Sequence, residues 1–179
     1  NYSFDENMAD SLKLWKMFES IQQCQIPVIG MAHGAVFGGA LGLLSACDYV
    51  YSEEKTQFCF SEVKLGLAPA VISGHISKKI PDAFYRPLML SAEVFSALQA
   101  KNIGLIQQIY SDKIEISDVV KKFSINGFTA MKETKKLLNT LLDFQTGEKN
   151  ADRIKNECVR VISERRLSPE GQERMKNFL

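Results

Sequence analysis

The sequence is poor in the residues that build metal centres and nucleophile triads. It has two histidines, His33 and His75, and four cysteines, none of which form a CxxC pair. The cysteine spacing indicates neither a zinc site nor a disulfide framework, and it favours a reducing compartment, with the cytoplasm as the expected location. No carboxylate and nucleophile accompany either histidine, so a Ser/His/Asp triad is not expected. The cysteines are Cys24, Cys47, Cys59 and Cys158.

An excess of one charge and long apolar runs are also missing. The 22 basic and 21 acidic residues nearly cancel, which argues against a nucleic-acid or membrane-surface partner. No apolar run reaches the length of a membrane span, and the polar, acidic start "NYSFDENMADS" is unlike a secretory signal. The composition, 45% hydrophobic and 24% charged over 179 residues, is that of an ordinary globular chain.

Apolar periodicity predicts an α/β first half and a helical second half. The sequence shows no internal repeat and no low-complexity tract. The expected strands are 26–33, 48–52, 57–62 and 105–110, and a glycine turn follows the first of them. The expected helices are 10–23, 39–47, 74–79, 83–90, 91–104, 117–126, 128–144, 149–165 and 169–179.

The stretch "GAVFGGALGLLSACD", residues 34–48, places four glycines between a strand and a helix. Such a turn leaves free N–H groups at the helix N-terminus, where they attract negative charge. The spacing of the glycines gives neither G-x-x-x-x-G-K-[ST] nor G-x-G-x-x-G, so an oxyanion is favoured over a nucleotide phosphate or pyrophosphate. The alternative is that the glycines only allow the helix to pack closely on the strand.

Glu62 stands at the end of the expected strand 57–62, in the largely apolar segment "FCFSEVKLGLAPA". Burial among apolar neighbours favours the protonated form of a carboxyl group and suits an acid that exchanges protons with a substrate. The alternative is a solvated or salt-bridged residue at a sheet edge. An oxyanion-type turn in the same chain favours the catalytic interpretation.

The segment "IPVIGMAHGAVFGGALGLLSACDYVYSEEKTQFCFSEVKLGLAPA" resembles the central signature of the enoyl-CoA hydratase/isomerase, or crotonase, superfamily. Within it, the chain is most similar to 3-methylglutaconyl-CoA hydratase-like members. The resemblance implies an α/β fold, a crotonase-type (ClpP/crotonase) spiral of ββα units with a helical C-terminal trimerisation region. Residues 1–115 would be the C-terminal part of the ββα core and residues 116–179 the helical region. It also implies a homotrimer or a dimer of trimers.

The resemblance assigns roles to individual residues. The backbone N–H of Gly39 would bind the thioester carbonyl, Glu62 would move a proton at the substrate carbons, and the backbone amide of Ala70 would help to hold the reacting water. The substrate would be an acyl-CoA or acyl-carrier-protein thioester, with coenzyme A entering only as part of it, and no metal or other cofactor is implied. The acyl pocket would be lined by Val36, Phe37, Gly38, Leu65, Ala68, Pro69 and Ala70.

Three departures from the family pattern qualify these expectations. Many hydratases carry a second glutamate where this chain has Gly42. The upstream "A-G-x-D-[LI]" segment, which supplies the other oxyanion donor, does not occur, so the chain is expected to begin after it. The end at "NFL" is expected to cut short the basic C-terminal tail.

Water addition to an α,β-unsaturated thioester is the expected reaction. Double-bond isomerisation, decarboxylation of a glutaconyl thioester and a non-catalytic paralogue remain as alternatives.

The remaining polar residues have plainer interpretations. His75 falls near the implied acyl pocket, where a packing role is favoured over contact with a polar substrate. Asp48 is expected to cap or to accept a local hydrogen bond. Lys64 and Arg86 are expected to be solvated. Cys47 and Cys59 are expected to be buried as small hydrophobic residues.

Overall fold

The structure is a computed structural model that describes residues 3–111, 113–143, 168–170 and 172–173. The chain forms two compact units. The first comprises residues 1–24 and 28–113, and the second comprises residues 25–27 and 114–179.

The first unit opens with a long helix, α1 (Phe4–Gln22). It begins six residues before the expected start at position 10, because Ser3 and Glu6 form a capping box. The Ser3 hydroxyl accepts from the Glu6 N–H at 3.2 Å, and the Glu6 carboxylate accepts from the Ser3 N–H at 2.7 Å. These bonds satisfy donors that a helix N-terminus otherwise leaves free.

Two three-stranded sheets form the centre of this unit. One has the order β1–β3–β6 and is parallel throughout. The other has the order β2–β4–β5, with β2 and β4 parallel and β5 antiparallel to β4. The first four strands alternate between the two sheets, and helix α2 (Gly39–Ala46) lies between β2 and β3 in the chain. The strands are β1 (Ile29–Ala32), β2 (Ala35–Phe37), β3 (Tyr49–Glu53), β4 (Gln57–Cys59), β5 (Phe95–Ser96) and β6 (Gln108–Tyr110).

Three sequence predictions about these elements were wrong. The glycine segment was expected to be a turn, but it contains strand β2. The strand expected over 57–62 ends at Cys59, because its partner β2 is only three residues long and Phe37 pairs with Cys59. The helix expected over 91–104 is divided into strand β5, which pairs with β4, and α5 (Ala97–Asn102).

Short helices complete the first unit after β4. They are the 3-10 helix η1 (Glu62–Leu65), α3 (Ala70–Ile76) and α4 (Asp82–Ser91). The core lies between the sheets and these helices, and Phe95 stacks on Phe58 and Phe60 with ring centroids 5.5 and 5.9 Å apart.

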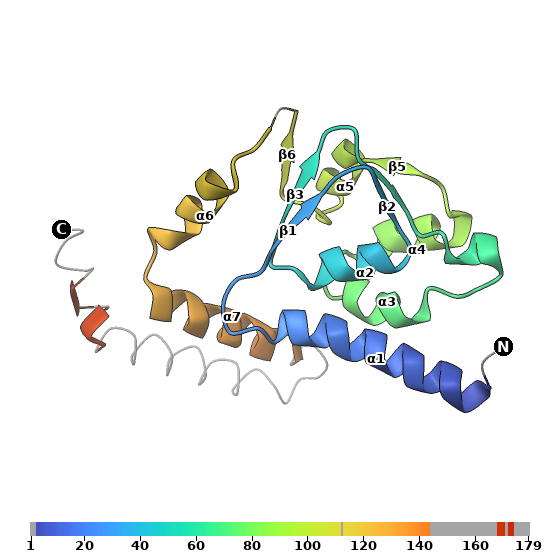
Figure 1. Ribbon diagram of the computed structural model, residues 1–179, viewed down its shortest axis with the longest axis horizontal. Helices are drawn as coiled ribbons and strands as arrows, with labels where there is room; N and C mark the ends of the chain where they lie inside the picture. The colour runs from blue at the N-terminus through green and yellow to red at the C-terminus, as the bar shows by residue number, and fades with distance from the viewer. Residues whose placement is uncertain (1–2, 112, 144–167, 171, 174–179) are drawn as a thin grey trace. The chain divides into compact units, whose positions relative to one another are not determined.

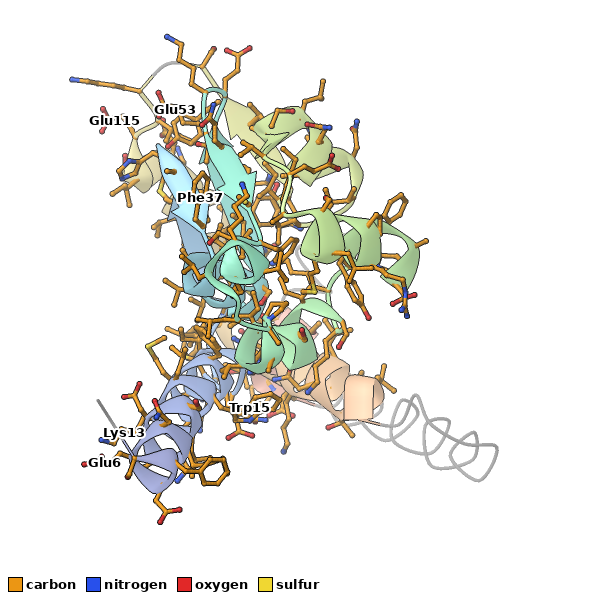
Figure 2. All side chains as sticks on the ribbon, turned by 90° about the vertical axis from the view of Figure 1, so that its right-hand side faces the viewer. Glu6, Lys13, Trp15, Phe37, Glu53 and Glu115 are labelled. Carbon is orange, nitrogen blue, oxygen red and sulfur yellow. The ribbon has the colours of Figure 1, made fainter. Side chains whose placement is uncertain are left out.

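Helix α1 packs against α2 and α3, as Figure 1 shows, and two glycines make this contact possible. A Cβ at Gly42 on α2 would lie 2.8 Å from the Phe18 ring, and one at Gly74 on α3 would lie 2.5 Å from the Trp15 ring. The aromatic rings of α1 therefore occupy the space that side chains would need at positions 42 and 74. Trp15 lies on the side of α1 toward α3, whereas Glu6 lies near the N-terminal end of α1 (Figure 2).

The second unit contains α6 (Ile116–Ser124) and α7 (Phe128–Asp143). The Glu170 carboxylate accepts from the N–H groups of Thr129 and Ala130 at 3.2 and 3.1 Å, and so caps the start of α7. The buried Lys135 amine donates to the Ile26 carbonyl at 3.0 Å. The helices expected over 149–165 and over most of 169–179 lie outside the described residues. Within those residues, no helix has the length and apolarity to cross a membrane.

Candidate active site

The candidate site forms where two neighbouring strands end. Because β2 and β4 are parallel and Phe37 pairs with Cys59, the residues that follow both strands emerge at the same edge of the sheet. Gly38 follows β2 and donates its N–H to the Cys59 carbonyl at 3.0 Å. Glu62 follows β4 after two residues. Residues 24 positions apart in the sequence thus become neighbours, as the catalytic interpretation requires.

Gly38 has a backbone conformation that only glycine adopts without strain, with φ 54° and ψ −124°. A Cβ at this position would lie 3.3 Å from the Ser61 hydroxyl oxygen and 3.4 Å from Glu62 Oε1. The missing side chain therefore has two effects. It allows the sharp turn into α2, and it lets the Glu62 carboxylate approach the backbone at the start of that helix.

Glu62 lies on η1 and not on a strand, which corrects its expected position. Its side chain is half-buried, and Oε2 is fully buried without a hydrogen-bond partner among the described residues. A buried carboxylate oxygen with no partner is costly, so it usually marks a group that meets a ligand. If Glu62 were a solvated or salt-bridged residue at a sheet edge, Oε2 would contact water or a basic side chain. It is buried and contacts neither among the described residues.

Gly39 is the first residue of α2, and its N–H has no acceptor among the described residues. It is exposed, and a Cβ built on it would meet nothing within 4 Å. A free donor at a helix N-terminus with open space beside it can stabilise a developing oxyanion. The donor and the Glu62 carboxylate lie at the same turn, because Gly39 follows Gly38 in the chain and the Glu62 side chain lies against Gly38.

The place of the second glutamate in many hydratases is filled by packing. Gly42 is buried, and a Cβ there would lie 2.6 Å from Ile72 Cγ2 and 2.8 Å from the Phe18 ring. No side chain fits at this position without displacing α1 or α3. The described part of the site thus holds a single carboxylate.

The residues expected to line the acyl pocket lie in different environments. Val36 belongs to the hydrophobic core, and Phe37, which is exposed, points to the opposite face of β2. The two side chains cannot both line one face of the strand, and the assignment of Val36 and Phe37 to the acyl pocket stays a prediction. Figure 2 shows Phe37 on β2. Leu65 and Ala68 are exposed and Pro69 is half-buried, on the segment that follows Glu62.

Ala70 is the first residue of α3. Its N–H donates to the Ala68 carbonyl at 2.7 Å within the loop that leads into that helix. The expected role of this N–H in holding the reacting water stays a prediction.

His75 takes the packing role. It is buried, its Nδ1 lies 3.0 Å from Gln22 Oε1, and its ring lies beside those of Trp15 and Phe18. The amide oxygen can only accept, so this contact is a hydrogen bond in the tautomer that carries the proton on Nδ1. Nε2 is buried without a partner among the described residues. Burial is the main cause that lowers the pKa of His75, and the Lys78 charge lowers it further.

The other singled-out residues have structural partners. Asp48 accepts from the Val28 N–H at 2.6 Å, as a local capping role predicts. Arg86 forms a bidentate, exposed pair with Asp82 at 2.8 and 3.0 Å. Lys64 is exposed, and its amine lies 3.7 Å from the Cys59 sulfur.

The cysteines of the described chain are free thiols. Cys47 and Cys59 are buried and Cys24 is half-buried, while Cys158 lies outside the described residues. The described residues contain no cluster of three or more His, Cys, Asp or Glu side chains that could hold a metal ion.

Lys79 was not predicted to have a role. Its amine donates to the Leu44 and Cys47 carbonyls at 3.0 and 2.8 Å. These carbonyls stand at the C-terminal end of α2, the helix that begins at Gly39. No local pattern in "SKKIP" distinguishes this lysine from its exposed neighbour Lys78.

Comparison with known proteins agrees with this geometry. Residues 3–172 match the sequence profile described as enoyl-CoA hydratase/isomerase. The chain belongs to this family. The membership confirms the resemblance on which the site assignment was based, while the narrower likeness to 3-methylglutaconyl-CoA hydratases stays a prediction.

Solved structures of the family show the same fold. An enoyl-CoA hydratase from Shewanella pealeana is 33% identical, with a TM-score of 0.84 over 99% of this chain and 66% of its own. An enoyl-CoA hydratase from Mycobacterium smegmatis is 19% identical with a TM-score of 0.91, which concerns the fold alone. The crotonase-type α/β fold expected from the sequence is therefore confirmed.

Curated relatives in the family carry two kinds of activity in their names. An enoyl-CoA hydratase from Alternaria alternata is 28% identical over 167 residues, which cover 93% of this chain and 55% of the relative. A peroxisomal Delta(3,5)-Delta(2,4)-dienoyl-CoA isomerase from Arabidopsis thaliana is 34% identical over 102 residues, 56% of this chain and 37% of the relative. The chain thus spans about half the length of these relatives or less.

Proposed function

We propose that this protein adds water to an α,β-unsaturated acyl thioester, with Glu62 as the only carboxylate that moves protons. The observation that carries the proposal is the buried, unpartnered Oε2 of Glu62 beside the Gly38 turn, next to the free N–H of Gly39. A carboxylate beside an oxyanion donor is suited to chemistry that passes through a thioester enolate.

One carboxylate is sufficient for this reaction. The Glu62 carboxylate accepts a proton from water as the water oxygen bonds to Cβ of the substrate, and the double-bond electrons move to the thioester carbonyl oxygen. The Gly39 N–H stabilises that oxyanion. Glu62 then returns the proton to Cα as the carbonyl re-forms, so that one water molecule is added and the carboxylate is restored.

The substrate and the second oxyanion donor belong to the same proposal. The family resemblance assigns that donor to an "A-G-x-D-[LI]" segment. It also makes 3-methylglutaconyl-CoA the first substrate to test. Losing one donor of an oxyanion hole typically lowers the rate by about 100-fold to 1000-fold, so both are needed for efficient turnover.

Double-bond isomerisation is a second candidate, and Gly42 favours it. Because Phe18 and Ile72 fill the place of a second carboxylate, the described site has no other acid to hold a water molecule. Isomerisation needs no water, since Glu62 could remove a proton from one carbon and return it to another. The name of the Arabidopsis relative, a dienoyl-CoA isomerase, is in keeping with such chemistry.

A panel of thioesters separates the two reactions. Purified protein is incubated with 3-methylglutaconyl-CoA, a straight-chain 2-enoyl-CoA and a 3-enoyl-CoA, and the products are analysed by mass spectrometry. Hydration adds the mass of one water and removes the enoyl absorbance, whereas isomerisation conserves the mass. Products of unchanged mass from the 3-enoyl-CoA alone would replace the first candidate with the second.

The matched variants are Glu62→Gln and Glu93→Gln. Removing a general acid or base typically costs about 100-fold to 10000-fold in rate, so Glu62→Gln should lose nearly all turnover. Glu93 is an exposed glutamate between α4 and β5, and its amide variant should retain wild-type turnover. Equal turnover by the Glu62→Gln variant and the wild type would refute the catalytic assignment.

A further inference from the structure

The segment that carries Glu62 contacts both ends of helix α2. At one end, Glu62 and Ser61 lie against Gly38, directly before the helix. At the other end, the Lys79 amine donates to the Leu44 carbonyl at 3.0 Å and to the Cys47 carbonyl at 2.8 Å. The segment from Glu62 to Lys79 thus spans the whole length of α2, with α3 packed along it.

Lys79 supplies what the C-terminal end of α2 lacks. The last carbonyls of a helix have no partners inside the helix, and they carry the negative end of its dipole. The C-cap bond from the Cys47 N–H to the Leu44 carbonyl satisfies only part of this need. One ammonium group that binds two of these carbonyls fixes the end of the helix and offsets its negative charge.

The same helix begins with the Gly39 N–H, which faces the proposed oxyanion. Helix α2 has eight residues and is about 12 Å long, so the two ends are electrostatically coupled. A positive charge at the C-terminal end favours a negative charge at the N-terminal end. The charge is also partly removed from water, because Lys79 is half-buried.

We propose that Lys79 is a positioning residue that holds the C-terminal end of α2 and strengthens the anion site at its N-terminal end. This inference rests on the proposed function, because it concerns the enolate that forms at Gly39. Lys79 touches neither substrate nor reacting atoms, and it acts through the helix and through the segment that it ties to Glu62.

The charge of Lys79 depends on pH. Burial lowers the pKa of this amine to about 8, while the Cys47 thiol and the Asp48 carboxylate act in the opposite direction. Cys47 is the C-cap residue of α2, and Asp48 follows it. Below about pH 8 the ammonium supports the anion site, and above that pH the support is lost.

The test compares Lys79→Met, Lys79→Arg and the control Lys101→Met, which removes an exposed lysine from the last turn of α5. With charges about 14 Å apart and an effective dielectric constant of about 20, kcat should fall roughly fivefold to tenfold in Lys79→Met. KM should change little. Lys79→Arg should keep kcat near neutral pH and lack the decline above about pH 8 that is expected of wild type.

Two outcomes would overturn the inference. One is a folded Lys79→Met variant with the kcat and the pH profile of the wild type. The other applies where Lys79→Met does not fold, as judged by circular dichroism. In that case, an equal alkaline decline in wild type and Lys79→Arg would refute the electrostatic role.

A binding experiment separates this inference from the proposed function. Acetoacetyl-CoA forms a stable enolate whose ultraviolet absorption can be followed without turnover. If no thioester is turned over but wild type promotes this enolate more than Lys79→Met does, the proposed function fails and the role of Lys79 stands. If wild type turns over substrate and both proteins form equal enolate, only the role of Lys79 fails.

Discussion

Replacing Gly42 with alanine should destabilise the protein, although alanine is the better helix former. The added Cβ would lie 2.6 Å from Ile72 Cγ2 and 2.8 Å from two atoms of the Phe18 ring, where ordinary contact begins at 3.4 Å. Both neighbours are buried and belong to other helices, so neither can rotate into solvent.

The magnitude follows from two opposing effects. Overpacking in a well-packed core costs about 1–3 kcal/mol, and replacing glycine by alanine inside a helix gains about 1 kcal/mol. The expected net loss in Gly42→Ala is therefore up to about 2 kcal/mol in the free energy of unfolding. The variant Gly39→Ala in the same helix is the control, because its Cβ meets nothing within 4 Å, and it should not be destabilised.

A double-mutant cycle with Phe18→Ala tests the cause. Phe18→Ala alone should cost about 3–5 kcal/mol, but Gly42→Ala should cost about 1–2 kcal/mol less in that background, because the ring is no longer in the way. Equilibrium urea unfolding followed by circular dichroism measures all four proteins. Strict additivity, or a Gly42→Ala variant more stable than wild type, would refute the packing explanation for the single carboxylate.

Two further predictions concern Gly38 and His75. Gly38→Ala should lower turnover at least about tenfold by displacing Glu62. The control is Gly104→Ala, because Gly104 also has a positive φ but no neighbour within 4 Å, and this variant should lose stability and keep its activity. Equal turnover in the two variants would contradict this prediction. Because the pKa of His75 is lowered in the folded state, its contribution to stability is complete above about pH 6.5 and declines as the pH falls below that value. Urea midpoints measured on acidification should therefore fall less in His75→Phe than in wild type, and identical pH profiles would show that another group is responsible.

The sequence identified the two parts of the site but not how they meet. The glycines and Glu62 stand out locally, because one residue type has unusual backbone freedom and the other places a charge in an apolar segment. Their proximity depends on the pairing of β2 with β4, and a three-residue strand such as "AVF" has too little pattern to be recognised. Once β2 is known, the alternation of its side chains explains why Val36 is buried and Phe37 is not.

Packing across the fold was harder to anticipate. Gly42 and Gly74 each receive an aromatic ring from α1, and this fit depends on how three helices pack and not on any one segment. The role of Lys79 likewise depends on carbonyls 32 and 35 residues earlier in the chain. The long helices and most strands were predictable, because their apolar spacing reports burial directly.

The contact between α1 and α3 also gives the protein an internal optical probe. Trp15 is the only tryptophan in the sequence, and its ring lies 4.6 Å from the His75 ring and against Gly74. Its fluorescence emission should therefore report the attachment of α1 to α3. Protonated imidazole quenches nearby indoles, so emission intensity at constant folding also follows the charge of His75. Loss of this signal before the far-ultraviolet dichroism changes would show that α1 separates from the first unit ahead of global unfolding.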